Sequence, residues 1–425
     1  MSEQLLIKNA HIIGAGEPFN GDILVADGKI SAIGSFDAPS DCETIDATGL
    51  VAAPGLIDLH VHLRDPGLTH KEDIISGCKA AAAGGVTGVV AMPNTKPSVD
   101  NEETLAYILE KAKNASAKVY PVAAVTKGLK GEELVDFDTL SAAGACAFSD
   151  DGEPVKTAPL LLEALKASQR CGKPFLAHCE EKSLALGGLM NEGEVSQKLG
   201  VKGIPNAAED IGTAREIAAA MSTGTRVHIC HVSTAESVNI IRAAKAVGAD
   251  VTAETCPHYF ALTEDKLLSR DADYRMNPPL RTEKDRLAII EGIVDGTIDA
   301  IATDHAPHAE SEKADFLSAP NGSVGIETSL SAGITYLVKT GIITLRKLID
   351  MMSTVPAKIL GVEGGSLAVG SAADIVVFSE SESWTVDPDK LHGKSKNTPF
   401  KGMKLCGRVK YTILNGKTVY KDEVL

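Results

Sequence analysis

The pair His60 and His62 is the part of this chain best suited to chemistry. It follows the apolar run from 50 to 57, which predicts a buried strand. Because side chains alternate across a strand, both imidazoles point to one side and Val61 points to the other. Two imidazoles that converge at a strand end can hold one divalent metal ion. A His-x-His pair alone is a weak signal, so its interpretation depends on the residues that follow.

Other histidines and aspartates stand at the C-terminal ends of further apolar runs. They are Asp150 with Asp151, then His178, His231 and Asp304. In a closed sheet of parallel strands these ends meet at one mouth, where a (β/α)8 barrel places its active site. Together with the first pair they offer four imidazoles and at least two carboxylates. That set suits two borderline divalent cations such as zinc.

Strand-like and helical segments alternate through the middle of the chain, as a parallel sheet requires. Helical patterns cover residues 74–83, 157–170, 207–221 and 233–247. The expected strand ends are His60, Asn94, Val125, Asp151, His178, His231, Thr255 and Asp304. Eight strand ends predict an α/β fold, a (β/α)8 TIM barrel over residues 54–365.

Short alternating strands occupy both ends of the chain. Asp27-Gly28 and Asn415-Gly416 separate strand-like runs, and both pairs are two-residue hairpin signals. Since the two ends have the same pattern, we expect residues 1–53 and 366–425 to form one small, discontinuous β-sandwich domain beside the barrel.

Composition excludes several classes of function. With 425 residues and 44% hydrophobic content, the chain can bury a large core. The net charge of -15 argues against a nucleic-acid partner or an anionic membrane. The first residues show no secretory signal, and no apolar run is long enough to span a bilayer. Eight cysteines without a Cys-x-x-Cys pair favour reduced thiols and a cytoplasmic location.

Seven short motifs occur in a specific order along the chain. They are Asp58–Gly67, Met92–Thr95, Ser149–Gly152, His178–Glu180, His231–Thr234, Met276–Arg281 and Thr303–His308. Each motif alone is modest, but in this order the set is highly specific. The chain resembles the amidohydrolase superfamily of cyclic amidases, and most closely the type I bacterial dihydroorotases. The resemblance covers essentially the whole chain.

The resemblance implies a centre of two Zn²⁺ per subunit. One metal would be held by His60, His62 and Asp304, the second by His178 and His231, with Asp151 and a hydroxide as bridges. Many relatives bridge with a carboxylated lysine at this strand, whereas the nearest lysine here is Lys156. That departure favours the type I group over hydantoinases and allantoinases. Asp150 is the weaker candidate for the bridge, because Asp151 matches the motif and only one of the two faces the mouth.

The implied reaction is the reversible hydrolysis of the cyclic amide of (S)-dihydroorotate to N-carbamoyl-L-aspartate. It is the third step of de novo pyrimidine (UMP) biosynthesis. A hydroxide between two cations is nucleophilic near neutral pH, because the metals lower the pKa of water. Asp304 would take the proton of that water and pass it to the departing ring nitrogen. Such general base and acid catalysis contributes roughly 10²–10⁴-fold in rate.

The ring carboxylate of this substrate requires a cationic partner. Arg64 stands two residues after His62 and suits bidentate carboxylate binding. The family binds this carboxylate at positions that match Arg64, Asn94 and His308. It contacts the ring amides at positions that match Asn277, Pro320, Asn321 and Gly322. We also expect the irregular segment 309–325 to act as a mobile lid over the mouth.

Alternatives remain open at this point. Any one of the six metal-binding candidates could be an ordinary polar residue at a strand end, although six at matching strand ends argue against that. An allantoinase or hydantoinase would favour a lysine in place of Asp151 and would lack the carboxylate clamp. An inactive scaffold that supports aspartate carbamoyltransferase would have lost metal ligands, and here the set is intact. The resemblance also suggests a homodimer and an association with aspartate carbamoyltransferase.

Several nearby residues receive a structural interpretation. By strand alternation, Cys179 and Cys230 face opposite the neighbouring histidines and are expected to pack between strand and helix. By the same rule His228 is expected to lie under a helix. His258 and His305 are interpreted as structural residues of the loops that carry them.

Overall fold

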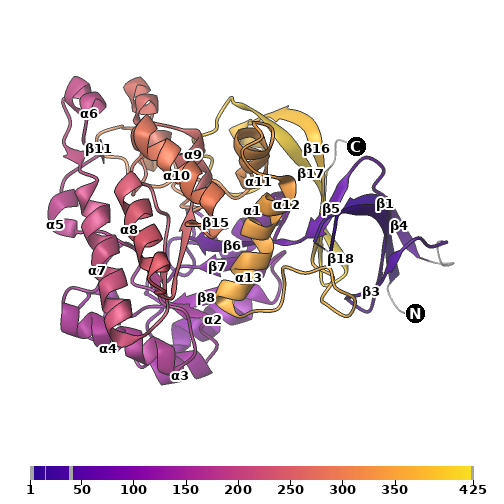
Figure 1. Ribbon diagram of the computed structural model, residues 1–425, viewed down its shortest axis with the longest axis horizontal. Coiled ribbons are helices and arrows are strands. Elements are labelled where there is room, and N and C mark those ends of the chain that lie inside the picture. The colour runs from indigo at the N-terminus through magenta and orange to yellow at the C-terminus, as the bar shows by residue number, and fades with distance from the viewer. Residues whose placement is uncertain (1–3, 15, 38–41, 423–425) are drawn as a thin grey trace.

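A computed structural model describes residues 4–14, 16–37 and 42–422. In this described part, eight parallel strands form a closed barrel (Figure 1). They pair as two groups of four, β6-β7-β8-β9 and β10-β13-β14-β15. Parallel bridges from Phe148 to Phe175 and from Val61 to His305 join the groups at both edges. The strands are β6 (Leu56–Val61), β7 (Val86–Ala91), β8 (Lys118–Ala123), β9 (Ala147–Phe148), β10 (Leu176–Ala177), β13 (Val227–Ile229), β14 (Val251–Thr255) and β15 (Ala300–Ile301).

The barrel strands are buried on both faces. Every residue of β6 and β7 is buried, which is the pattern of a parallel sheet covered by helices. Ile57, Leu59 and Val90 belong to a cluster that fills the barrel, whereas Leu56 and Val89 pack on the outside. The two clusters separate the interior, which leads to the mouth, from the layer under the helices.

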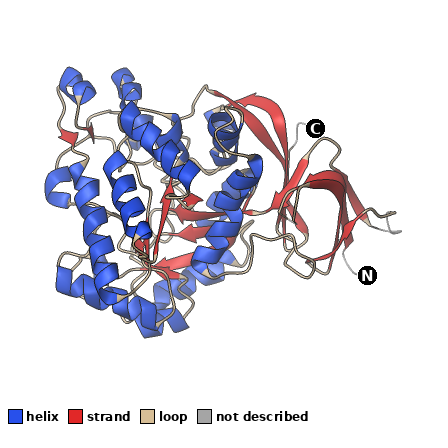
Figure 2. Ribbon diagram, in the orientation of Figure 1, coloured by secondary structure: helices blue, strands red, loops and turns tan. Residues whose placement is uncertain are grey.

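Helices cover the outside of the barrel (Figure 2). The helix α1 has the predicted bounds, and the other three predicted helices begin or end within two residues of the predicted limits. Asp73, Thr234 and Thr282 cap α1, α8 and α10 by accepting a backbone N–H from the first turn. The main covering helices are α1 (Ile74–Ala83), α2 (Glu102–Ala112), α3 (Phe137–Ala142), α4 (Ala158–Arg170), α7 (Ala207–Thr223), α8 (Ala235–Ala246) and α10 (Glu283–Asp295).

Shorter elements interrupt this alternation. One group lies between β10 and α7, one helix follows β14, and three helices follow β15. They are α5 (Lys182–Ala185), β11 (Met190–Asn191), α6 (Glu194–Leu199), β12 (Gly203–Ile204), α9 (Pro257–Ala261), α11 (Ser329–Gly333), α12 (Leu345–Ile349) and α13 (Val355–Leu360).

Both ends of the chain contribute to a separate eight-stranded sheet beside the barrel (Figure 1). Its order is β18-β17-β16-β5-β1-β2-β3, and β4 pairs with β1. The strands are β1 (Gln4–Ile12), β2 (Phe19–Ala26), β3 (Lys29–Gly34), β4 (Glu43–Asp46), β5 (Val51–Pro54), β16 (Ile375–Thr385), β17 (Lys404–Leu414) and β18 (Lys417–Lys421). The predicted α/β barrel with a small β-domain built from both termini is confirmed.

The two predicted hairpin turns and the apolar run of residues 50–57 can be compared with this sheet. Asp27 and Asn415 have positive φ, as each two-residue hairpin turn requires, and each precedes a glycine. The apolar run of residues 50–57 is not one strand. It is divided between β5 of the small sheet and β6 of the barrel, so it joins the two parts of the molecule.

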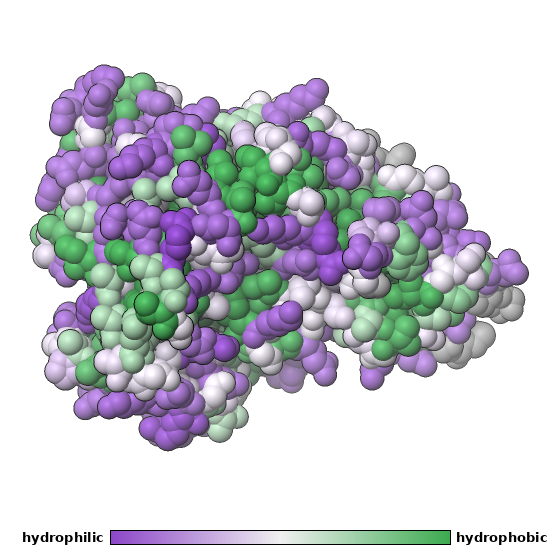
Figure 3. Space-filling model, in the orientation of Figure 1, coloured by the Kyte–Doolittle hydropathy of each residue, from purple (hydrophilic) through white to green (hydrophobic). Residues whose placement is uncertain are grey.

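Hydrophilic residues cover most of the helical layer on the face drawn in Figure 3, and hydrophobic residues gather near α11 and α12. None of the helices in the described ranges combines the length and apolar character needed to cross a membrane. The residues suited to chemistry are buried within the barrel mouth, as described next.

Candidate metal centre and active site

Asp151 is at the centre of a buried cluster of imidazoles. Its Oδ1 lies 3.3 Å from His60 Nε2, 3.5 Å from His178 Nδ1 and 3.7 Å from His231 Nε2. Its Oδ2 lies 3.6 Å from His62 Nε2. His178 Nδ1 and His231 Nε2 are themselves 2.9 Å apart. One carboxylate therefore faces all four histidines singled out in the sequence.

The neighbouring Asp150 has a different task. Its Oδ1 accepts the backbone N–H groups of Val125 and Thr126, at 2.7 and 3.0 Å. It therefore holds the end of β8 and does not face the histidines. Of the two adjacent carboxylates, only Asp151 points into the cluster.

Asp304 and Asn94 complete the cluster on the side of His62. Asp304 Oδ1 lies 3.0 Å from His62 Nε2 and 3.7 Å from His60 Nε2. The side-chain oxygen of Asn94 lies 2.8 Å from His62 Nδ1, and its amide donates to Asp151 Oδ2 at 3.2 Å. Asn94 therefore orients two members of the cluster.

Unusual backbone turns the key side chains toward the mouth. Arg64, His231 and Asp304 all have positive φ, at 59°, 37° and 46°. Non-glycine residues adopt this region rarely, and it often occurs at functional sites. Because each of these residues leaves its strand in this conformation, strand alternation no longer decides where its side chain points.

Two buried carboxylates hold the backbone next to the cluster. Asp58 Oδ1 accepts the N–H groups of His60 and Thr303, at 3.2 and 3.0 Å, so it joins the first and last barrel strands. Glu209 Oε1 accepts the N–H of Ser233 at 2.8 Å, two residues after His231. The cluster is therefore supported by bonds to its backbone as well as by packing.

The histidines and carboxylates of the cluster stabilise each other's charged forms. Burial disfavours the ionised ring of His60, but the Asp151 carboxylate raises the pKa of His60 well above its usual value. Burial likewise opposes ionisation of Asp151, yet the charge of His60 holds its pKa well below the usual range. The nearby carboxylates of Asp151 and Glu180 raise the pKa of His178 to about 9 despite its burial.

A metal ion fits the donors present in the cluster. His60 Nε2 and Asp151 Oδ1 are buried and face each other, yet neither has a hydrogen-bond partner among the described residues. Unpaired buried polar atoms are costly, and a cation between them would satisfy both. Two groups of donors meet within coordinating range of one another, His60 with His62 and Asp151, and Asp151 with His178 and His231.

A cationic group lies beside the cluster. The Arg64 guanidinium donates to the Pro307 carbonyl at 3.2 Å and lies 3.4 Å from His308 Nε2. Lys71 Nζ is 3.1 Å from His308 Nδ1. Burial lowers the pKa of Arg64 to about 10, which leaves it charged at neutral pH. Arg64 and His308 are therefore adjacent, and their binding of a substrate carboxylate stays a prediction.

The segment from Pro320 to Gly322 lies against this pair. The backbone oxygen of Asn321 is 2.9 Å from His308 Nε2. Gly322 has φ +135, and a Cβ at this position would lie 2.8 Å from the Ala306 backbone oxygen, so a larger residue does not fit. Lys313 Nζ donates to the backbone oxygens of Pro320 and Gly322, both at 3.0 Å. The segment is thus bound to the barrel mouth.

Asn277 is oriented by a carboxylate that received no role from the sequence. Its side-chain amide donates to Glu180 Oε1 at 2.9 Å, and Glu180 Oε2 lies 3.6 Å from His178 Nε2. Although burial opposes it, His178 lowers the pKa of Glu180 to about 2. The sequence signal that could have identified Glu180 is its position two residues after His178, a candidate metal ligand.

Two interpretations of β13 were wrong. His228 does not lie under a helix, because its Nε2 is 3.1 Å from Glu254 Oε2 inside the barrel. Cys230 also lies in the interior cluster, and only Cys179 packs on the outer side. The cause is the positive φ of His231, which brings it to the same side as His228 and Cys230. A second residue to which the sequence gave no role is Glu254, a fully buried glutamate on β14.

A closed (β/α)8 barrel with imidazoles and carboxylates gathered at the ends of its strands defines the class of amidohydrolases, which are metal-dependent. The chain matches the Dihydro-orotase-like family over residues 49–237 and the Amidohydrolase family over residues 197–420. It is 51% identical to a dihydroorotase of Geobacter metallireducens, over 98% of this chain and 99% of that protein. It is 48% identical to a dihydroorotase of Acetivibrio thermocellus, over 99% and 100% of the two chains.

Solved structures of cyclic amidases have the same fold. The L-hydantoinase (dihydropyrimidinase) of Arthrobacter aurescens superposes with a TM-score of 0.88 at 27% identity, covering 100% of this chain and 98% of that one. The dihydropyrimidinase of Brevibacillus agri gives 0.85 at 27% identity, with coverage of 99% and 95%. The chain belongs to the amidohydrolase family and, within it, to the dihydroorotases.

Proposed function

We propose that this protein catalyses the reversible hydrolysis of (S)-dihydroorotate to N-carbamoyl-L-aspartate, with two Zn²⁺ in the barrel mouth. The observation that carries this proposal is the 51% identity to a dihydroorotase over 98% of the chain. The geometry of the site supports it in three respects, which are the donor set, the carboxylate at Asp304 and the Arg64 guanidinium beside them.

The proposed ligands are the six residues of the cluster. His60, His62 and Asp304 would hold one cation, and His178 and His231 the second, while Asp151 would bridge the two. When bound, the cations would lower the pKa of water and polarise the carbonyl of the ring amide. A carboxylate bridge that comes from Asp151 and not from a lysine supports dihydroorotase over the hydantoinase reaction of the structural neighbours.

Asp304 is proposed as the general base and acid. Burial would raise its pKa, but the hydrogen bond to His62 and the charge of His60 hold the pKa below the usual range of a carboxyl group. Asp304 is therefore ionised before reaction and able to accept a proton. Its position within the cluster would let it return that proton to the leaving ring nitrogen.

Arg64 is proposed to bind the ring carboxylate, together with His308. The guanidinium can form two parallel charge-assisted hydrogen bonds with a carboxylate. Asn94, Asn277 and the backbone of Pro320, Asn321 and Gly322 stay predicted substrate contacts. The side-chain amides of Asn94 and Asn277 both donate to neighbouring carboxylates, so contact with substrate requires them to share or exchange those bonds.

An activity assay with paired substrates tests the proposal. Purified protein is incubated with dihydroorotate, N-carbamoyl-L-aspartate, dihydrouracil and hydantoin, and the metal content of the same sample is measured. We expect interconversion of the first pair, about two zinc ions per chain, and little turnover of rings that lack the carboxylate. Faster turnover of dihydrouracil or hydantoin would contradict the assigned substrate.

Assembly and organisation are also proposed from the family. We propose a homodimer, and two folding units formed by residues 54–365 and by 1–53 with 366–425. Association with aspartate carbamoyltransferase and a cytoplasmic location stay predictions. Light scattering on the purified protein, alone and mixed with that enzyme, distinguishes a monomer, a dimer and a larger complex.

A further inference from the structure

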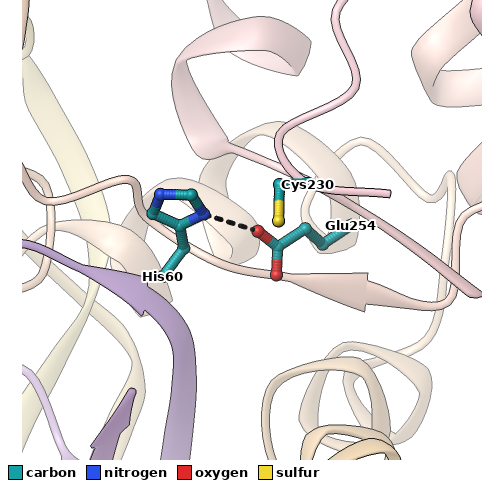
Figure 4. Close-up of side chains that lie close together, drawn as sticks. All are labelled: His60, Cys230 and Glu254. Atoms are coloured by element: carbon teal, nitrogen blue, oxygen red, sulfur yellow. Dashed lines mark hydrogen bonds and ion pairs between the residues drawn. The ribbon is translucent and has the colours of Figure 1, made fainter. Parts of the chain in front are cut away.

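A chain of buried side chains leads away from the metal cluster into the barrel. Figure 4 shows its first pair, His60 and Glu254. His60 Nδ1 lies 3.2 Å from Glu254 Oε1, and His228 Nε2 lies 3.1 Å from Glu254 Oε2. The far nitrogen of His228, Nδ1, is 2.8 Å from the hydroxyl oxygen of Thr252. The side chains of His60 and Glu254 are 0% exposed, and that of His228 is 1% exposed.

The direction of each hydrogen bond follows from the chemistry of these groups. The fully buried carboxylate of Glu254 has an imidazole nitrogen at each of its two oxygens, which is the environment of an ionised carboxylate paired on both sides. An ionised carboxylate only accepts, and therefore both histidines donate to it. Thr252 can donate its hydroxyl hydrogen to His228 Nδ1. This arrangement gives each of these groups a partner when a metal ion, and not a proton, is on His60 Nε2.

The same arrangement fixes the tautomer of His60. With the ring hydrogen on Nδ1, toward Glu254, the lone pair is on Nε2, toward Asp151, where it can bind a metal ion. A metal-binding histidine needs this state, and a carboxylate behind the ring also makes the ring a stronger donor. We propose that Glu254, held in turn by His228 and Thr252, is the positioning residue that prepares His60 to bind metal. The inference rests on the metal centre proposed above.

Two neighbouring groups do not share this role. Cys230 lies close to His60 and Glu254 (Figure 4), but a thiol is only a weak hydrogen-bond donor and acceptor and orients an imidazole less firmly than a carboxylate does. Glu180 stands behind His178 in a comparable place, yet the two atoms are 3.6 Å apart and His178 Nε2 has no hydrogen-bond partner among the described residues. Of the two carboxylates behind the ligands, Glu254 is therefore the closer to a ligand nitrogen, at 3.2 Å from His60 Nδ1.

The test measures metal affinity directly, by zinc competition with a chromogenic chelator. Glu254→Gln keeps the size of the side chain, but it accepts from one histidine and presents an N–H to the other. We expect a 10–100-fold weaker affinity for one of the two zinc ions. Glu254→Asp should regain part of the affinity because it keeps the carboxylate. Activity of Glu254→Gln should rise when excess zinc is added.

Matched controls separate positioning from a general effect on the fold. Glu216→Gln alters another buried glutamate on α7, and Cys230→Ala removes the thiol beside His60. Both should bind zinc as the unchanged protein does. Equal zinc affinity of Glu254→Gln and the unchanged protein would overturn the inference, and so would equal losses in Glu254→Gln and Glu216→Gln.

A second measurement uses the unchanged protein and therefore needs no folded variant. In a crystal structure of the zinc-loaded protein, we expect zinc on His60 Nε2 and the Glu254 carboxylate within hydrogen-bond distance of Nδ1. Zinc on Nδ1, or Glu254 turned away, would overturn the inference while leaving the metal centre in place. An unchanged protein that binds no zinc would instead contradict the proposed metal centre itself, and this inference with it.

Discussion

His62 Nε2 lies 3.0 Å from Asp304 Oδ1, although the two residues are 242 positions apart in the chain. The first and last barrel strands bring them together, and Asp58 joins these strands by accepting N–H groups from both. Both residues are proposed to hold metal, and Asp304 alone is also proposed to carry a proton. Substitution can separate these tasks.

Asp304→Asn should lower the rate of dihydroorotate hydrolysis by roughly 10²–10⁴-fold, because the amide keeps an oxygen ligand but is no base. Asp304→Ala removes the ligand as well and should also reduce the zinc content. Rates and zinc content are measured on the same preparations. If Asp304→Asn kept most of the rate, the residue would serve coordination alone.

Asp151→Asn should fold and lose at least one zinc ion, because a neutral amide lacks the charge that bridges two cations. The rate should fall on the order of 10³-fold, since metal assistance is worth several kcal/mol. Asp150→Asn is the adjacent control, and we expect it to change stability more than zinc content. Full zinc occupancy and activity of Asp151→Asn would show that another group is the bridge.

Arg64→Met should raise KM for dihydroorotate on the order of 10–100-fold, because a charge-assisted hydrogen bond is worth about 1.5–3 kcal/mol. Steady-state kinetics give KM and kcat separately. For a ring amide without the carboxylate the change should be far smaller. A similar loss for both kinds of substrate would mean that Arg64 supports the site and does not recognise the carboxylate.

Because Glu216 is buried, we expect the folding stability of the protein to depend on pH. Burial raises its pKa from 4.5 to about 7, and its Oε2 has no hydrogen-bond partner among the described residues. The folded state therefore holds the proton more tightly than the unfolded state. Its contribution to stability is present below pH 4.5 and is lost as pH rises to about 7, by up to about 3 kcal/mol.

Glu216→Gln should accordingly raise the melting temperature at pH 8 and change it little at pH 5. Scanning calorimetry at both pH values measures the difference. Glu163→Gln, on the exposed side of α4, is the control and should have no pH-dependent effect. If Glu216→Gln raised the melting temperature equally at pH 5 and pH 8, the substitution would act through packing and not through the charge of Glu216.

The segment 309–325 is predicted to close further over bound substrate. Substrate analogue should slow proteolytic cleavage within it, because ordered backbone is a poor protease substrate. Lys313→Met removes the buried lysine that binds the oxygens of Pro320 and Gly322, so cleavage should be faster. Equal cleavage with and without analogue would contradict the lid.

The sequence by itself determined the class of fold and the donors of the site. Alternating strand and helix patterns predicted the barrel, and the hairpin signals at both ends predicted the small sheet. The six metal-binding candidates were also visible, because each follows an apolar run that forms a barrel strand. These signals are local, since periodicity and turn chemistry act over a few residues.

The tertiary structure decided which way individual side chains point and what lies behind them. His228 was misplaced because the rule of alternation fails at His231, where positive φ turns the side chain. Glu254 was missed because a glutamate in a strand is informative only once both histidines that pair with it are known to be near. Those partners are 26 and 194 positions away, and only closure of the barrel brings them to one carboxylate.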